Sequence, residues 1–192
     1  MKTKSILFSL LLMSVNLLAQ KNHNWNFEFR SAGSYATQNL GDADLNMGLG
    51  FEGNFSYRLM PHLSATLGWG WNKFSAERSF FGSDMNFEET GYTFGLQFLH
   101  PINNSGISYL VRGGGIYNHI EIENEKGDIT HDSGHGLGWQ IETGLAFELN
   151  NQLSIIPSIR YRSLSRDIKT DDKNVSIDLN YLSAGIGLSW SF

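Results

Sequence analysis

The chain has 192 residues, which fits one domain, and a formal net charge of −5. It has no cysteine, which excludes a disulfide framework and a thiolate metal site. It has 21 glycines but only 3 prolines, and few prolines suit paired strands because each one removes a ladder donor. Apolar residues make up 41% of the chain although its mean hydropathy is −0.25, which favours alternating apolar side chains over long apolar runs.

The first predicted element is a signal peptide at residues 1–19. Lys2 and Lys4 form a positive start, residues 6–18 are mostly apolar, and Ala19 precedes the expected cleavage point. The alternative, a permanent helical anchor, is disfavoured because this stretch is shorter than the roughly 20 residues that span a membrane. Removing the signal takes two of the 14 basic residues, which leaves 12 against 19 acidic ones and a net charge of −7. That charge argues against nucleic acid as a partner.

Residues 20–192 are predicted to form one domain of eight strands, because apolar and polar side chains alternate with period two. In residues 45–59, seven of the eight odd positions are apolar or aromatic and none of the seven even positions is. A strand directs successive side chains to opposite faces, so one face is apolar and the other polar. The same alternation predicts strands near residues 24–30, 45–59, 63–71, 91–98, 107–112, 137–149, 153–161 and 182–192.

The connections between these strands alternate in length. Three are short turns, at residues 60–62, 100–106 and 150–152. Four are longer and more polar, near residues 36–44, 74–86, 123–135 and 165–175. With both termini on one side, all the short turns fall on that side, as in transmembrane barrels with short periplasmic turns and long outer loops.

The direction of the faces separates a membrane barrel from a soluble sandwich or lipocalin-like barrel, which would alternate too. All five tryptophans lie on the apolar face, which is too bulky for the interior of an eight-stranded barrel. We therefore expect this face to meet lipid and the charges of the polar face to pair in the lumen, because an unpaired buried charge is costly. The expected structural charge network, which would plug the lumen, consists of Glu28, Arg30, Glu52, Arg58, Arg112, Glu142, Glu148, Arg160 and Arg162.

Two positions depart from the regular pattern. Pro157 lies on the apolar face of the seventh strand and cannot donate to a ladder, so we expect a bulge or a strand shift there. Before Tyr181 the odd positions are apolar, as at Ile177 and Leu179, whereas from Leu182 onward the even positions are apolar. A β-bulge would produce this change of phase.

The C-terminus carries the most specific motif. The last six residues read Gly187-Leu188-Ser189-Trp190-Ser191-Phe192, which is similar to the signal that directs barrels to the outer membrane. With this motif and the strand pattern, residues 20–192 resemble the OmpA/OmpX-like eight-stranded outer-membrane β-barrel proteins. The resemblance implies that the barrel assembly machinery reads Gly187, Trp190 and Phe192, although Gly185 stands where that signal usually has a polar residue. We also expect a monomer in the bacterial outer membrane, in contact with lipid and lipopolysaccharide.

Two pairs of side chains raise the question of catalysis, because lipid A–modifying enzymes exist on small barrels and a deacylase needs a serine beside a histidine base. His62 and Ser64 lie two residues apart, but at a turn on the expected periplasmic side, away from lipid A. His119 and Glu121 lie at the expected outer end of the fifth strand, where no serine is obvious beside them. We assign no catalytic residue and expect no enzymatic activity.

His131, Asp132 and His135 form an H-D-x-x-H cluster in the third long connection, and nitrogen and oxygen ligands at this spacing suit zinc. Structural zinc sites almost always use four ligands, so three on a loop favour solvated side chains. We assign no metal site and expect no cofactor.

The sequence therefore predicts an all-β fold, a closed, antiparallel, eight-stranded transmembrane β-barrel. The expected role is structural or surface-binding through the extracellular loops, because loops on a rigid scaffold are where binding usually resides. Charged residues are frequent in these loops, among them Glu123, Glu125, Lys126, Asp128, Asp132, Lys169, Asp171, Asp172 and Lys173. The alternatives are a narrow passive channel, a lipid A–modifying barrel enzyme and a soluble exported barrel.

Overall fold

The computed structural model describes residues 24–192 apart from residues 42, 80 and 170–173. The predicted signal peptide at residues 1–19 lies outside the described residues. The regular elements of the described part are all β-strands. Within that part, no helix is long and apolar enough to cross a membrane.

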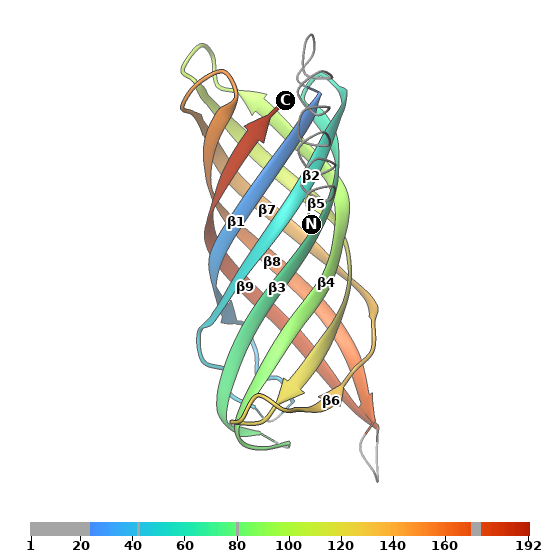
Figure 1. Ribbon diagram of the computed structural model, residues 1–192. Coiled ribbons are helices and arrows are strands. Elements are labelled where there is room, and N and C mark those ends of the chain that lie inside the picture. The colour runs from blue at the N-terminus through green and yellow to red at the C-terminus, as the bar shows by residue number, and fades with distance from the viewer. Residues whose placement is uncertain (1–23, 42, 80, 170–173) are drawn as a thin grey trace, which may run out of the picture.

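Eight of the strands form a closed antiparallel ring (Figure 1). The strands are β1 (Trp25–Ala36), β2 (Gly48–Met60), β3 (Leu63–Ser79), β4 (Gly82–Pro101), β5 (Ile107–Glu123), β6 (Ile129–Asp132), β7 (Gly136–Glu148), β8 (Leu153–Lys169) and β9 (Asn174–Ser191). The order around the ring is β4-β3-β2-β1-β9-β8-β7-β5, and β4 pairs with β5 to close it. The predicted fold class, a closed antiparallel eight-stranded barrel, is confirmed.

The strand that is not part of the ring is β6, a short strand that precedes β7 in the chain and lies in line with it. It pairs with the last residues of β5, which lie past the end of the pairing between β5 and β7. Residues 133–135 separate β6 from β7, so the two strands follow one line along β5 with an interruption between them.

The two ends of the barrel differ in their connections. The turn end, which is uppermost in Figure 1, carries the C-terminus and the connections at residues 61–62, 102–106 and 149–152. The hairpin end carries β6, the connection at residues 124–128, and the ends at which β1 and β2, β3 and β4, and β8 and β9 follow one another in the chain. The predicted short turns therefore lie together at one end.

The strands extend further toward the hairpin end than the sequence pattern predicts. The predictions of long connections near residues 74–86 and 165–175 are wrong, because β3 and β4 occupy most of the first range and β8 and β9 most of the second. The predicted connection near residues 123–135 contains β6. In these segments most outward side chains are polar and most inward ones are apolar, which reverses the pattern of the same strands nearer the turn end. Arg166, which is buried, and Ile129, which is exposed, are exceptions.

The change of phase near Tyr181 is not caused by a bulge. β8 and β9 pair in one register along their whole length. Odd positions of β9 point into the barrel on both sides of the change, since Leu179 and Ser183 are both buried while Leu182 is exposed. The predicted bulge is therefore wrong, and what changes along the strand is the chemistry of its two faces.

Pro157 also leaves the register unchanged, so the bulge or shift predicted there is wrong. It pairs with Ile186 of β9. On its other side, the pairing of β7 with β8 lapses at residues 145–146 and 156–157 and then resumes in the same register. Proline has no amide hydrogen, and here its absence leaves a local gap in one ladder.

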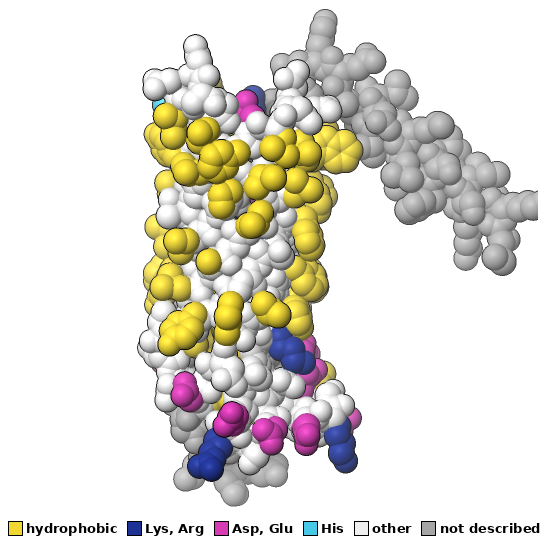
Figure 2. Space-filling model, turned by 90° about the vertical axis from the view of Figure 1, so that its left-hand side faces the viewer, with side chains coloured by type: hydrophobic (Ala, Val, Ile, Leu, Met, Phe, Trp, Pro, Cys, Tyr) yellow, Lys and Arg dark blue, Asp and Glu magenta, His cyan; other side chains and the backbone are white. Residues whose placement is uncertain are grey.

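The outward side chains form an apolar belt around the barrel (Figure 2). Leu67 is 61% exposed, Ile186 is 60% exposed and Trp190 is 55% exposed. Toward the hairpin end the belt gives way to acidic and basic side chains (Figure 2), which we call the charged collar. The collar includes Lys73, Glu77, Glu88, Glu121, Glu123, Asp167 and Asp178.

Candidate functional site

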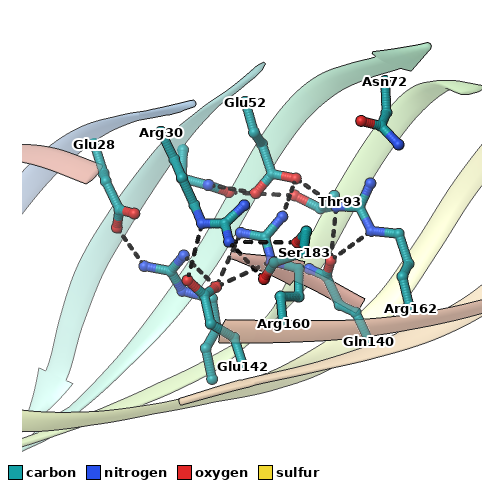
Figure 3. Close-up of polar contacts among 12 residues, drawn as sticks. Glu28, Arg30, Glu52, Asn72, Thr93, Gln140, Glu142, Arg160, Arg162 and Ser183 are labelled. Carbon is teal, nitrogen blue, oxygen red and sulfur yellow. Dashed lines mark hydrogen bonds and ion pairs between the residues drawn. The ribbon is translucent and has the colours of Figure 1, made fainter. Parts of the chain in front are cut away.

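The lumen inside the belt contains a continuous series of buried ion pairs (Figure 3). Period two places one side chain in every pair of residues inside the barrel, and at these positions the strands carry charges. Four glutamates and four arginines take part, namely Glu28, Arg30, Glu52, Glu89, Arg112, Glu142, Arg160 and Arg162. We call this set the lumen charge network.

Glu142 of β7 is the centre of the part nearer the turn end. Its Oε2 lies 3.1 Å from Nη1 of Arg112 and 2.9 Å from Nη2 of Arg160. Its Oε1 lies 3.4 Å from Nε of Arg30. Arg112 also reaches across the lumen to Glu28, with Nη2 and Oε2 separated by 2.5 Å. One carboxylate thus neutralises charge from three strands.

Glu52 of β2 links this part to the side nearer the hairpin end. Its Oε2 lies 2.7 Å from Nη1 of Arg160 and 2.5 Å from Nη2 of Arg162. Arg162 continues the series to Glu89, with Nη1 and Oε1 separated by 3.1 Å. The hydroxyl of Tyr181 donates a hydrogen bond to Glu89 and ends the series. Because the series contains equal numbers of glutamates and arginines, its net charge is zero.

Two predicted members stay outside the lumen charge network. The side chains of Arg58 and Glu148 are exposed at the turn end and line an open hollow of about 650 Å³. The prediction that they pair in the lumen is therefore wrong. Their inward parity was correct, but at the mouth of the barrel water solvates a charge and no partner is required.

One member of the lumen charge network, Glu89, was not predicted from the sequence, and neither were its uncharged partners. Glu89 shares the parity of Thr93 on β4, but it lies two residues before the predicted start of that strand. The amide oxygens of Gln97 and Gln140 accept hydrogen bonds from the network arginines at 2.6 and 2.8 Å respectively. Extending the alternation of this strand to residues before 91 would have identified Glu89. The uncharged partners could not be recognised, because no charge marks them in the sequence.

From Tyr181 toward the hairpin end, mainly apolar side chains are buried together inside the barrel, and we call this cluster the apolar plug. Ile116, Ile120 and Ile122 of β5 are each 0% exposed. The connection between β1 and β2 adds three residues to those from the strands. The plug consists of Leu40, Ala43, Leu45, Phe74, Ala76, Met85, Phe87, Ile116, Ile120, Ile122, Leu164, Ile168, Ile177, Leu179 and Tyr181.

The residues of the expected assembly signal lie on β9 and just after it. Trp190 is 55% exposed in the apolar belt, and its ring centroid lies 6.3 Å from that of Phe192. Gly187 points inward, where an added Cβ would lie 2.6 Å from Oε1 of Glu28. Gly187 therefore leaves room for the charge network, and recognition of these residues by the assembly machinery remains a prediction.

Among the described residues, no serine forms a hydrogen bond with the histidine of either candidate pair for catalysis. Nδ1 of His62 lies 3.1 Å from the carbonyl oxygen of Leu99, and its ring packs on His100 at 4.5 Å. No hydrogen bond between His62 and Ser64 occurs in the described part of the chain. Near His119, the hydroxyl of Ser133 donates to the Gly134 carbonyl oxygen.

The predicted H-D-x-x-H cluster is divided in the structure. The ring of His131 packs on Phe81 at 5.0 Å, away from the others. Asp132 instead meets His119 of β5, with Oδ1 and Nδ1 separated by 3.1 Å, and His135 stacks on His119 at 4.4 Å. The side chain that contacts Asp132 therefore comes from β5 and not from the motif itself.

A closed antiparallel ring with an apolar outer belt and a charged, buried lumen defines a transmembrane β-barrel. The chain belongs to the outer membrane protein beta-barrel domain family, whose model matches residues 6–192. The resemblance to outer-membrane barrels is thereby confirmed, and the family places the chain in the bacterial outer membrane. By the usual orientation of such barrels, the turn end is periplasmic and the hairpin end extracellular.

Several solved structures share the fold at low sequence identity. Neisserial surface protein A has a TM-score of 0.66 and 13% identity, covering 88% of this chain and 97% of that chain. AlkL in DMPC lipid bilayers has a TM-score of 0.57 and 17% identity, covering 88% and 89%. OprG from Pseudomonas aeruginosa has a TM-score of 0.56 and 13% identity, covering 85% and 95%. No curated protein matches the chain.

Proposed function

We propose that the chain is an integral outer-membrane protein with a structural or surface-binding role, and that its lumen is closed to solutes. The observation that supports the proposal is that two successive groups of side chains are buried inside the barrel. The charge network occupies the part inside the belt, and the apolar plug occupies the part toward the extracellular end. A hollow between Arg30, Glu52 and Arg160 has a volume of only about 20 Å³, room for about one water molecule.

If the lumen is closed, the extracellular hairpins are the part of the protein where binding would occur. β3, β4, β8 and β9 carry the barrel wall past the belt, so the hairpin tips are held on paired strands. A rigid wall that presents charged, exposed side chains suits contact with other molecules at the cell surface. Neisserial surface protein A, whose fold is similar, is named for such a location.

The proposed partners follow from the belt and the C-terminus. The apolar belt would contact membrane lipid and lipopolysaccharide, and the assembly machinery would recognise Gly187, Trp190 and Phe192 during insertion. We propose export by the predicted signal peptide at residues 1–19, a monomeric state, no cofactor and no nucleic-acid partner. We also propose that the protein is not an enzyme.

Planar-bilayer recording tests the closed lumen. The full barrel is refolded, its insertion is verified by heat-modifiable gel mobility, and currents are recorded beside protein-free membranes. We expect no steady discrete openings, because charges and apolar side chains block the path in series. Steady openings of one size would contradict the proposal and support a narrow channel.

The enzymatic alternative has a separate test. Lipid A from cells with and without the protein is compared by mass spectrometry. Identical spectra are expected, because neither histidine pair is joined to a serine nucleophile in the described residues. A mass change that matches the loss or gain of an acyl chain would contradict the non-enzymatic proposal.

A further inference from the structure

A group of potential metal ligands lies on the outer wall of the barrel, outside the lumen charge network. His119 and Glu121 occupy outward positions of β5, and Asp132 lies opposite Glu121 on β6. His119 lies two residues beyond Tyr117, which is 45% exposed in the belt. Two residues of strand correspond to about 7 Å, so the group lies on the extracellular side of the belt, in reach of dissolved ions.

The three side chains converge closely enough to share one ion. Nδ1 of His119 lies 3.1 Å from Oδ1 of Asp132 and 3.9 Å from Oε1 of Glu121. One ligand atom from each residue lies within 4.8 Å of the others. In a tetrahedral zinc site with bonds of about 2.1 Å, neighbouring ligand atoms are about 3.4 Å apart. Small rotations of the side chains are enough to reach that geometry.

Backbone pairing of β5 with β6 and β7 brings these residues together. Between the pairs Asn118↔Gly136 and Glu121↔Asp132, the three residues that separate β6 from β7 stand opposite two residues of β5. Such a bulge turns side chains to new directions and is frequent next to functional sites. It is held by two hydrogen bonds, from Ser133 N–H to the Ile120 carbonyl at 3.0 Å and from Ile120 N–H to Ser133 Oγ at 2.8 Å.

The bulge also fixes the two flanking side chains. Gly134 adopts a φ of 65°, and its N–H donates to Oδ1 of Asp132 at 2.8 Å. The ring of His135 then stacks on that of His119, with centroids 4.4 Å apart and planes 13° apart. Stacking restricts the rotation of His119 and keeps its Nδ1 toward the carboxylates.

The charges of the group suit a cation. Glu121 and Asp132 supply two carboxylates, which would offset the charge of a divalent ion.

We propose that His119, Glu121 and Asp132 bind one divalent transition-metal ion, with zinc as the best match. One imidazole nitrogen and two carboxylate oxygens fit zinc, whereas calcium and magnesium prefer sites made of oxygen alone. Three protein ligands leave the fourth position to water or an external ligand. His135 is a positioning residue that orients His119 through the stacked rings.

Titration calorimetry of the full refolded barrel with zinc chloride tests the proposal. We expect one ion per barrel, and magnesium chloride in excess should not displace it. His119→Ala and Asp132→Asn should each weaken binding by at least roughly tenfold, since even second-shell changes cost that much. His131→Ala is the matched control and should leave the affinity unchanged, because its ring lies on Phe81.

Further variants separate ligands from positioning. His135→Phe keeps a flat ring against His119 without a nitrogen ligand, so it should retain most of the affinity, whereas His135→Ala should lose part of it. Each variant is first shown to be folded by heat-modifiable gel mobility. Absence of stoichiometric zinc binding, or equal loss in His131→Ala and His119→Ala, would overturn the proposal. Loss in His135→Phe as large as in His119→Ala would overturn the assignment of the three ligands.

Discussion

The side chains buried inside the barrel differ in kind between its two halves. Inside the apolar belt the lumen holds the charge network, where buried glutamates and arginines pair. Toward the extracellular end it holds the apolar plug, where buried isoleucine, leucine and phenylalanine side chains pack. The same strands build both halves, and β8 and β9 pass from one to the other in a single register.

The difference shows that the surroundings of the barrel decide which face is apolar. Against lipid, the outward face must be apolar, and polar groups are sequestered in the lumen where they satisfy one another. Past the belt the outward face meets water, so apolar side chains are buried in the lumen as in a soluble protein. One strand therefore carries a membrane pattern and a soluble pattern end to end.

Breaking the charge network at its centre should have the largest effect. Glu142→Ala leaves Arg30, Arg112 and Arg160 without a shared carboxylate. The free energy of unfolding in detergent or lipid should fall by about 3 to 5 kcal/mol, because unpaired buried charges remain. Urea unfolding followed by tryptophan fluorescence measures it. Glu148→Ala, at the exposed periplasmic mouth, is the control, and an equal loss there would refute a special role for the buried series.

Opening a cavity in the apolar plug should have a comparable or smaller effect. Ile120 is 0% exposed, so Ile120→Ala should lower the free energy of unfolding by about 2 to 5 kcal/mol. Ile129→Ala on β6, where the side chain is 56% exposed, should change it by less than about 0.5 kcal/mol. Equal values for the two variants in the same urea titration would mean that the plug is not packed.

The same charge placed at two outward positions of one strand, one within the belt and one beyond it, should separate the lipid-facing half of the barrel from the water-facing half. Ile186→Arg puts a cation in the belt and should destabilise the barrel in lipid by about 2 to 4 kcal/mol. Asp178→Arg, an outward position of the same strand in the charged collar, should cost less than about 1 kcal/mol. Refolding titrations in lipid vesicles measure both. Similar costs at the two positions would place the edge of the membrane elsewhere.

The smallest effect concerns the bulge at the extracellular end. The pKa of Asp132 is lowered because the Gly134 N–H and His119 outweigh the effect of burial. Its interactions therefore stabilise the bulge above the pKa of the unfolded state and are lost as the pH falls through the lower folded pKa. The Gly134 amide shift in NMR should titrate below the usual aspartate range. A midpoint at or above that range, or an unchanged titration in Asp132→Asn, would contradict this.

Period two was enough to predict the strand count, while the lengths of the connections indicated the barrel and the bulk of the tryptophans indicated the outward direction of the belt. It also identified seven members of the charge network, since inward parity follows directly from the alternation. It placed Arg58 and Glu148 in that network wrongly, because parity does not show how far along the strand water enters. Glu89 was missed for the related reason that its strand begins earlier than the belt pattern.

The sequence could not show the apolar plug, because the rule for the inward face reverses where the solvent changes. The change of apolar residues from odd to even positions between Tyr181 and Leu182 is visible in the sequence, but a β-bulge would produce the same sequence pattern. The effect of Pro157 could not be decided from the sequence either. A missing hydrogen-bond donor permits either a shift of register or a local lapse in pairing. Pairing of His119 with Asp132 depends on a bulge between β6 and β7 that leaves no sequence pattern.

The most direct test of the reversal is a single-cysteine scan along β9 in lipid bilayers. The chain has no cysteine, so each introduced thiol reports alone. Thiols at residues 178 and 180 should react quickly with a water-soluble maleimide, those at 182, 184 and 186 should be shielded by lipid, and those at 177, 179 and 183 should be protected inside the barrel. Fast reaction at 177 and 179 with protection at 178 would contradict the single register and restore the bulge.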